Sequence, residues 1–164
     1  MSEEKMTTFE VIVEIPKGSR NKYEYDHERH IVKFDRMLYS SMHYPCDYGF
    51  FNDTLALDGD PLDVLVLTTE PTFPGCHIDI RPIGVFNMVD NGDPDEKIVG
   101  IPVTDPIANQ IKSMDDLTPA FKNEVEHFFT VYKDLENKKV EIKGWESKEK
   151  ADQLITDAYK RFKK

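Results

Sequence analysis

Asp58-Gly59-Asp60-Pro61-Leu62-Asp63-Val64 places three carboxylates within six residues, around a glycine and a proline that favour a tight turn. Carboxylates this close raise one another's pKa, so the cluster is costly unless a cation is bound. The apolar residues that follow, as far as Leu67, predict a strand that enters the core and holds the turn rigidly. Oxygen ligands select hard cations, so the turn predicts a Mg²⁺ or Mn²⁺ site, with a solvated acidic turn as the alternative.

A second acidic turn has the same character. The stretch Asp90-Asn91-Gly92-Asp93-Pro94-Asp95-Glu96-Lys97 again combines carboxylates with glycine and proline, and it again borders strand-like sequence. Two such turns, each at the end of an apolar strand, favour convergence on one multinuclear site. Two unrelated hairpin loops are the alternative that spacing alone leaves open.

The charge balance limits the partners of the chain. Its 164 residues include 21 basic and 31 acidic side chains, which gives a net charge of −10. This excess of acid argues against a nucleic-acid partner, which would normally need a basic face. An anionic substrate would also be repelled unless metal ions or a local cluster of Lys and Arg reversed the field.

Length and composition indicate a single domain over residues 1–164. The sequence has no apolar run of transmembrane length and no signal-peptide pattern, so we expect a cytoplasmic protein with no membrane partner. Cys46 and Cys76 form no CxxC motif, and we interpret them as reduced, structural thiols.

Short strands dominate the first two thirds of the chain. Residues 8–15 alternate with Phe9, Val11, Val13 and Ile15 on one face. Strands are also predicted at 22–26, 30–35, 47–52, 62–67, 76–90, 96–103 and 138–145. Short strands separated by frequent turn signals favour a barrel or a sandwich.

Helices are expected late in the chain. Thr118-Pro119 supplies an N-cap and a proline at the first helical position, and apolar residues then recur at helical spacing from Phe121 to Leu135. A second amphipathic stripe follows Ser147 and runs from Ala151 to Phe162, and a short helical piece is predicted near 106–112. The chain is therefore expected to be an α+β protein, mainly β, built on a barrel.

Several polar residues lie where they could bind an anion and its metals. Strand periodicity puts Lys22, Glu24 and Asp26 on one face, where an exposed, charge-paired strand is the alternative. Arg36 stands near a strand end, and its guanidinium could clamp phosphate, although a surface arginine would look the same. Tyr48 lies in an aromatic stretch, 43–50, whose hydroxyl groups suit phosphate oxygens as well as core packing.

Tyr132 and Lys133 close an otherwise apolar helix, where a core tyrosine and a favourable charge near the helix C-terminus are the simpler interpretation. The five histidines form no pair at a strong metal-ligand spacing. Walker, GxGxxG and GxSxG motifs are absent from the sequence.

Taken together, these segments resemble the soluble family I inorganic pyrophosphatases of bacterial type. The resemblance covers nearly the whole chain in the family's order: EIPKGS (14–19), KYEYD (22–26), YPCDYGF (44–50), DGDPLDV (58–64), RPIGV (81–85) and HFFTVYKDLE (127–136). It implies a closed, five-stranded barrel of the oligonucleotide-binding (OB) type with two or three flanking helices. The implied activity is Mg²⁺-dependent hydrolysis of inorganic pyrophosphate to two orthophosphates.

The resemblance also implies a role for each matching residue. Metal ligands are implied at Glu24, Asp58, Asp63, Asp90 and Asp95, with Asp63 bridging two ions and Asp60 as the proton acceptor. Phosphate-binding positions match Lys22, Arg36, Tyr48, Tyr132 and Lys133, with Lys97 helping. Supporting positions match Glu14 and Tyr44. Several Mg²⁺ ions per site are expected, with Mn²⁺ as a substitute and Ca²⁺ as an inhibitor.

The implied chemistry fits these residue types. A water between two cations loses its proton readily and becomes a hydroxide nucleophile, while the metals, lysines and Arg36 neutralise the phosphate oxygens. Because the metals belong to the binding surface, an acidic protein can bind an anion. One position departs from the pattern: Asn91 stands where bacterial members often carry an acid, which predicts a weaker metal site near Asp90.

Two other functions are compatible with the sequence. One is a different metal-dependent phosphohydrolase, acting on nucleotides or phosphate monoesters. The other is a non-catalytic metal-binding barrel, which would leave Lys22, Arg36 and Lys133 unexplained. The resemblance further implies a homohexamer, with His127 near a subunit contact.

Overall fold

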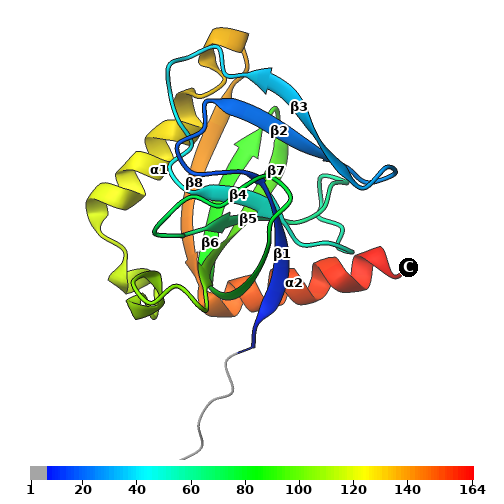
Figure 1. Cartoon of the computed structure of the whole chain (residues 1–164), viewed down its shortest axis with the longest axis vertical. Coiled ribbons are helices and arrows are strands. Elements are labelled where there is room, and N and C mark those ends of the chain that lie inside the picture. The colour runs from blue at the N-terminus through cyan, green and yellow to red at the C-terminus, as the bar shows by residue number, and fades with distance from the viewer. Residues whose placement is uncertain (1–6) are drawn as a thin grey trace, which may run out of the picture.

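The computed structural model of the chain describes residues 7–164. Five strands close into a ring in which each strand pairs with the next and the last pairs back to the first (Figure 1). In ring order they are β1 (Phe9–Ile15), β4 (Asp47–Phe50), β5 (Asp63–Val66), β7 (Asp93–Pro102) and β6 (His77–Asp90). The β5–β7 pairing is parallel and the others are antiparallel. The predicted α+β class and closed, OB-like barrel are confirmed.

The length of β6 lets it serve three partners. Its first residues pair with β1, and residues 84–90 pair with β8 (Val140–Ser147), while β7 pairs along most of its length. The strand is irregular between Pro82 and Gly84, where the pairing register shifts. Among the described residues, strand β8 pairs with β6 alone, along the second half of that strand, so it extends the sheet beyond the ring.

Close packing of β1 on β4 requires a glycine. A Cβ at Gly49 would collide with the carbonyl oxygen of Ile12, on the neighbouring strand. This glycine lies directly after Tyr48, a predicted site residue on the same strand.

Two helices cover separate parts of the core. Helix α1 (Pro119–Val131) begins as predicted, with the Thr118 side chain accepting from the Phe121 N–H at 3.1 Å. Helix α2 (Lys148–Phe162) also follows Ser147 as predicted. Leu65 belongs to the cluster under α1, whereas Val64 and Val66 belong to the cluster under α2. Both faces of β5 are therefore buried, which explains its unbroken apolar run.

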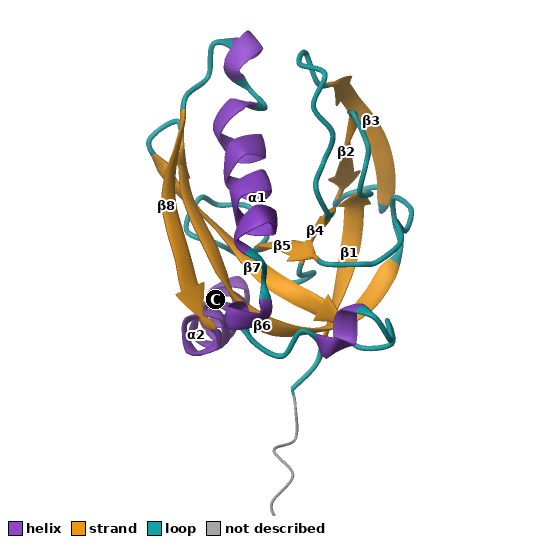
Figure 2. Cartoon of the chain, turned by 90° about the vertical axis from the view of Figure 1, so that its left-hand side faces the viewer, coloured by secondary structure: helices purple, strands orange, loops and turns teal. Residues whose placement is uncertain are grey.

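The strands β2 (Asn21–Asp26) and β3 (Ile31–Met37) form a separate two-stranded sheet. Figure 2 shows this sheet on one side of the molecule and α1 on the other, with the ring below and between them. Three short 3₁₀ turns complete the fold: η1 (Ala108–Gln110), η2 (Met114–Asp116) and η3 (Asp134–Glu136). Within residues 7–164, no helix is long and apolar enough to cross a membrane.

Some element boundaries differ from the prediction. The α1 stripe was expected to continue to Leu135, but the helix ends at Val131 and Leu135 is 63 % exposed. The reason is that the chain leaves helical geometry at Lys133 and enters η3. The helical piece predicted near 106–112 is the single short turn η1. The second apolar stripe was expected to reach Phe162, but that side chain is exposed at the end of α2. Cys46 and Cys76 are free, and Cys46 is buried in the core.

Candidate active site

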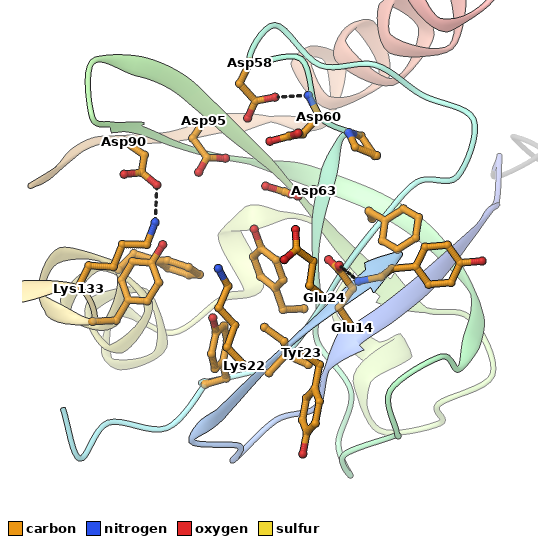
Figure 3. Close-up of a pocket in the computed structure, with 18 of the residues that line it drawn as sticks. Glu14, Lys22, Tyr23, Glu24, Asp58, Asp60, Asp63, Asp90, Asp95 and Lys133 are labelled. Atoms are coloured by element: carbon orange, nitrogen blue, oxygen red, sulfur yellow. Dashed lines mark hydrogen bonds and ion pairs between the residues drawn. The ribbon is translucent and has the colours of Figure 1, made fainter. Parts of the chain in front are cut away.

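A cavity of about 470 Å³ opens between the ring, the small β2–β3 sheet and the end of α1. Of the residues proposed from the sequence, all except Asp26, Arg36 and Lys97 line it: Glu14, Lys22, Glu24, Tyr44, Tyr48, Asp58, Asp60, Asp63, Asp90, Asp95, Tyr132 and Lys133. In Figure 3 the aspartates occupy one side, and Lys22 and Lys133 reach in from the other. The tertiary structure therefore brings the two acidic turns together.

Local backbone geometry shapes the acidic side. Gly59 has φ +89°, a conformation that side-chain-bearing residues rarely adopt, and it lets the turn close. The Asp60 N–H donates to Asp58 Oδ1 at 3.0 Å, and the Ala56 N–H donates to the Asp60 carbonyl at 2.7 Å. Asp63 then opens β5, so the acidic turn is fixed to a buried strand.

Lys97 lies beneath this acidic side. Its ammonium donates to Asp63 at 3.1 Å, to Asp95 at 3.0 Å and to the Tyr48 hydroxyl at 2.8 Å, and the side chain is 1 % exposed. Burial acts to lower the pKa of Lys97, but the attraction of Asp95 and Asp63 outweighs it and raises that pKa. Lys97 therefore remains charged between the two carboxylates.

The same surroundings shift the pKa values of the two carboxylates in opposite directions. Burial raises the pKa of Asp63 to about 7, although Lys97 opposes the shift. Burial also acts to raise the pKa of Asp95, but Lys97 prevails and holds that pKa below its usual value. Asp63 is thus the carboxylate of this pair for which burial outweighs the attraction of Lys97.

Glu14 reaches the cavity through an irregularity in β1. The β1–β4 register shifts between Val13 and Ile15, so Glu14 is the extra residue of a bulge. Its carboxylate accepts from the Tyr25 N–H at 2.8 Å, which ties β1 to the small sheet. Burial raises the pKa of Glu14 to about 7 against the effect of this hydrogen bond.

The opposite side of the cavity supplies cations and hydroxyl groups. Burial, together with repulsion from Arg36 and Lys133, lowers the pKa of Lys22. Lys133 forms an ion pair with Asp90 at 2.7 Å, across the gap between the end of α1 and the end of β6. Burial raises the pKa of Tyr44, Tyr48 and Tyr132 well above the usual value, so their hydroxyl groups stay protonated donors.

Arg36 lies outside the cavity lining. Its NH1 donates to Asp35 at 2.7 Å, its NH2 pairs with Glu136 at 2.9 Å, and its buried Nε has no partner. The sequence suggested a guanidinium that could clamp phosphate or lie on the surface, and the structure shows two carboxylates holding it.

Sequence reasoning missed His27 and Lys138 among the lining residues, and it gave Asp93 no individual role although it quoted the turn that contains it. His27 was considered only as a metal ligand and set aside, and Lys138 belongs to no motif. Lys138 follows Asn137, whose left-handed φ of +60° turns the chain back after η3. A turn-favouring Asn before a lysine pair was the available signal, and it is a weak one.

The donor set of the acidic side fits a hard divalent cation. All of the candidate ligands are carboxylate oxygens, and burial disfavours the charged form of Asp63 when no cation is nearby other than Lys97. Within residues 7–164, no three Asp, Glu, His or Cys side chains already form a complete metal-binding group. Lys97 instead compensates part of the charge, so the carboxylates would have to draw closer to hold an ion.

Comparison with known proteins gives a consistent result. Residues 11–163 match the family model described as inorganic pyrophosphatase. The chain is 57 % identical over 152 residues to an inorganic pyrophosphatase of Methanosarcina acetivorans, covering 93 % of this chain and 90 % of that one. It is 54 % identical over 153 residues to that of Geobacillus stearothermophilus, covering 93 % of both.

Solved structures agree with this match. The inorganic pyrophosphatase of Helicobacter pylori superposes with a TM-score of 0.94 at 39 % identity, covering 100 % of this chain and 98 % of that one. That of Coxiella burnetii gives a TM-score of 0.91 at 43 % identity, covering 99 % of both chains.

Proposed function

The chain belongs to the inorganic pyrophosphatase family, whose members hydrolyse pyrophosphate with the help of divalent metal, and on that premise we propose that it uses Mg²⁺ to convert pyrophosphate to two orthophosphates. The observation that carries the proposal is the cavity itself, in which carboxylates face lysines and tyrosine hydroxyls. A hard cation and a phosphate anion are the pair of ligands that such opposed walls suit. We propose that residues 1–164 act as one domain, because residues from Glu14 to Lys138 line this cavity.

The carboxylates are assigned to metals. Asp58, Asp63 and Asp95 would hold a first ion, Asp63 would bridge to a second, and Asp90 and Glu24 would hold further ions. When bound, the cations lower the pKa of the attacking water and neutralise phosphate oxygens. Mn²⁺ is the expected substitute, and Ca²⁺ is expected to bind without supporting turnover, because it is larger and less demanding in its geometry.

Asp60 is assigned as the proton acceptor. Its backbone is fixed by the hydrogen bond to Asp58, and its side chain lines the cavity without an ion-pair partner among residues 7–164. A carboxylate in this position can take the proton of the attacking water, which places that proton on an Asp60 oxygen.

The opposite wall is assigned to the phosphates. Lys22, Tyr48, Tyr132 and Lys133 would donate to phosphate oxygens, with Arg36 as a further clamp. Lys97 would act from beneath, by keeping Asp63, Asp95 and the Tyr48 hydroxyl in place. Lys133 now pairs with Asp90 and would donate to a phosphate oxygen, and Asp90 would be among the residues that hold a metal.

A phosphate-release assay tests the proposal. Pyrophosphate, ATP and a phosphate monoester are each supplied with and without Mg²⁺, and the expected result is release from pyrophosphate with Mg²⁺ alone. Faster release from ATP or from the monoester would indicate a different phosphohydrolase. Binding of metal and pyrophosphate without any release would indicate a non-catalytic metal-binding barrel.

We also propose that the protein is a cytoplasmic homohexamer that binds neither nucleic acid nor membrane. Exposed large apolar side chains, including Leu57, Phe73 and Ile107, offer surface for subunit contacts, and His127 is exposed on α1. Light scattering coupled to size-exclusion chromatography measures the assembly directly. A monomeric mass would reject the hexamer without affecting the proposed reaction.

A further inference from the structure

The two anion-binding sides of the cavity belong to parts of the fold that share no strand ladder. Lys22 lies on the β2–β3 sheet, which is separate from the six-stranded sheet. Tyr132 and Lys133 lie at the end of α1 and also line the cavity. Figure 2 shows α1 on the opposite side of the molecule from the small sheet. A phosphate group that touches both sides therefore depends on what holds the small sheet at the right distance from α1.

Glu136 makes that connection through Arg36. Its carboxylate pairs with Arg36 NH2, at 2.9 Å from one oxygen and 3.2 Å from the other. The Glu136 side chain is 8 % exposed and that of Arg36 is 23 % exposed, so solvent screens the pair weakly. Among residues 7–164, this is the one ion pair that joins the small sheet to the rest of the protein.

The pair also fixes the direction of the guanidinium. NH1 is held by Asp35 and NH2 by Glu136, so two carboxylates set the plane of the Arg36 fork. Asp35 in turn lies 3.5 Å from the Lys22 ammonium, which makes the position of Lys22 depend on the same network. A guanidinium has five N–H donors, so it can keep both carboxylates and still donate to a phosphate oxygen.

We propose that Glu136 is a positioning residue for pyrophosphate binding: by holding Arg36 it sets the small sheet, with Lys22, at the distance from Tyr132 and Lys133 that the substrate requires. The proposal rests on the proposed function, because it takes Arg36 and Lys22 as phosphate-binding residues. It adds a residue that touches no reacting atom and acts only through Arg36. The Michaelis constant should therefore respond to Glu136 more than the turnover number does.

Steady-state kinetics of Glu136→Gln and Glu136→Ala test this. The glutamine keeps the shape and loses the charge, so it tests the ion pair even if the alanine variant folds poorly. We expect the Michaelis constant for magnesium pyrophosphate to rise roughly fivefold or more, with the turnover number within about twofold. The matched control is Glu141→Gln, which removes the exposed ion pair between Glu141 and Lys143, whose oxygen and nitrogen are 2.8 Å apart, and should change neither constant.

A double-mutant cycle with Arg36→Ala shows whether Glu136 acts through Arg36. Arg36→Ala alone should raise the Michaelis constant, and adding Glu136→Ala to it should raise it no further. Mg²⁺ affinity measured by calorimetry without substrate should be the same in all variants, because the acidic side is not altered.

Three results would overturn the inference while leaving the reaction in place. An unchanged Michaelis constant in Glu136→Gln would show that the pair is only structural. A lower constant would show that Glu136 competes with the substrate for Arg36. A normal constant in Arg36→Ala would show that Arg36 takes no part in binding. If the unmodified protein releases no phosphate from pyrophosphate, the proposed function itself fails, which is a different result.

Discussion

Burial and charge act in opposite directions on the carboxylates of the cavity. Asp63 and Asp95 both contact Lys97, yet the pKa of Asp63 is raised to about 7 and that of Asp95 is lowered. The difference arises because desolvation outweighs attraction at Asp63 and attraction outweighs desolvation at Asp95. A bound cation would offset the desolvation of charged Asp63 more than that of Asp95, which agrees with the proposed bridging position of Asp63.

Asp63→Asn should remove the carboxylate that the proposal shares between two ions, with almost no change in side-chain size. Activity with pyrophosphate is expected to fall at least about a hundredfold, because the attacking water would lose its activation. Folding should survive, because Lys97 keeps Asp95 and Tyr48 as partners. Circular dichroism supplies the folding control, and near-normal turnover in a folded variant would refute the two-metal assignment.

Glu14→Gln should reveal the cost of burying a carboxylate. The folded-state pKa of Glu14, about 7, lies above the usual value of 4.5, so between these pH values the folded protein holds a proton that the unfolded chain releases. Glu14 therefore lowers the free energy of unfolding progressively from about pH 4.5 to pH 7. The glutamine can still accept from Tyr25 without that cost.

The variant is accordingly expected to be up to about 3 kcal/mol more stable than the unmodified protein at pH 8 in the presence of a chelator. Near pH 4, where Glu14 is protonated in both states, the difference should vanish. Urea unfolding at the two pH values measures it. An equal gain at both would mean that packing, and not ionisation, causes the effect.

At the level of elements, the β6–β7 hairpin explains the residue that departs from the family pattern. The strands end at Asp90 and resume at Asp93, so Asn91 and Gly92 form the two-residue turn, with φ of +53° and +85°. Asn-Gly is the pair that favours such a turn, because both positions need φ > 0. Asn91 therefore serves the turn while lying at the edge of the cavity.

Replacement of Asn91 should separate turn geometry from metal affinity. Asn91→Asp adds a negative charge and tolerates the left-handed backbone, whereas Asn91→Glu adds the charge with a strain of about 1 kcal/mol. Both should lower the Mg²⁺ concentration needed for half-maximal activity severalfold, and only the glutamate should lose stability. Mg²⁺ titrations at fixed ionic strength that superimpose on the unmodified protein would place residue 91 outside the metal shell.

At the scale of the whole molecule, the net charge is −10, so cations that bind the folded protein should raise its free energy of unfolding. Lys97 is the cation that lies between Asp63 and Asp95. An ion that binds the folded state alone stabilises it by about 2.7 kcal/mol at a concentration 100 times its Kd.

Mg²⁺ and Ca²⁺ should therefore both raise the thermal unfolding midpoint, but only Mg²⁺ should support hydrolysis. Ca²⁺ accepts looser coordination, so it can fill the carboxylate sites without the geometry that turnover needs. NaCl at matched ionic strength controls for screening, and Asp63→Asn should show a smaller midpoint shift with either ion. Hydrolysis with Ca²⁺ as fast as with Mg²⁺ would remove the need for the proposed geometry.

Much of the fold was readable from local pattern. Alternation in residues 8–15 and apolar runs bounded by turn signals predicted the strands of the ring, and Thr118-Pro119 predicted the start of α1, because caps and local patterns act between neighbours in sequence. Each acidic turn likewise marked a candidate site, because it combines turn-forming residues with a carboxylate excess at a strand end, but spacing alone left open whether the two turns meet. Local chemistry alone determined these features.

Tertiary structure decided the rest. The bulge that turns Glu14 inward depends on the register of β1 against β4, and the burial of Lys97 depends on the parallel pairing of β5 with β7. Helix α1 ends at Val131 because of how it faces the small sheet. The same arrangement brings Arg36 to Glu136, which is 100 residues away in the sequence. Sequence pattern reports on neighbours, whereas a buried ion pair depends on contacts between distant segments, and only the folded chain brings those segments together.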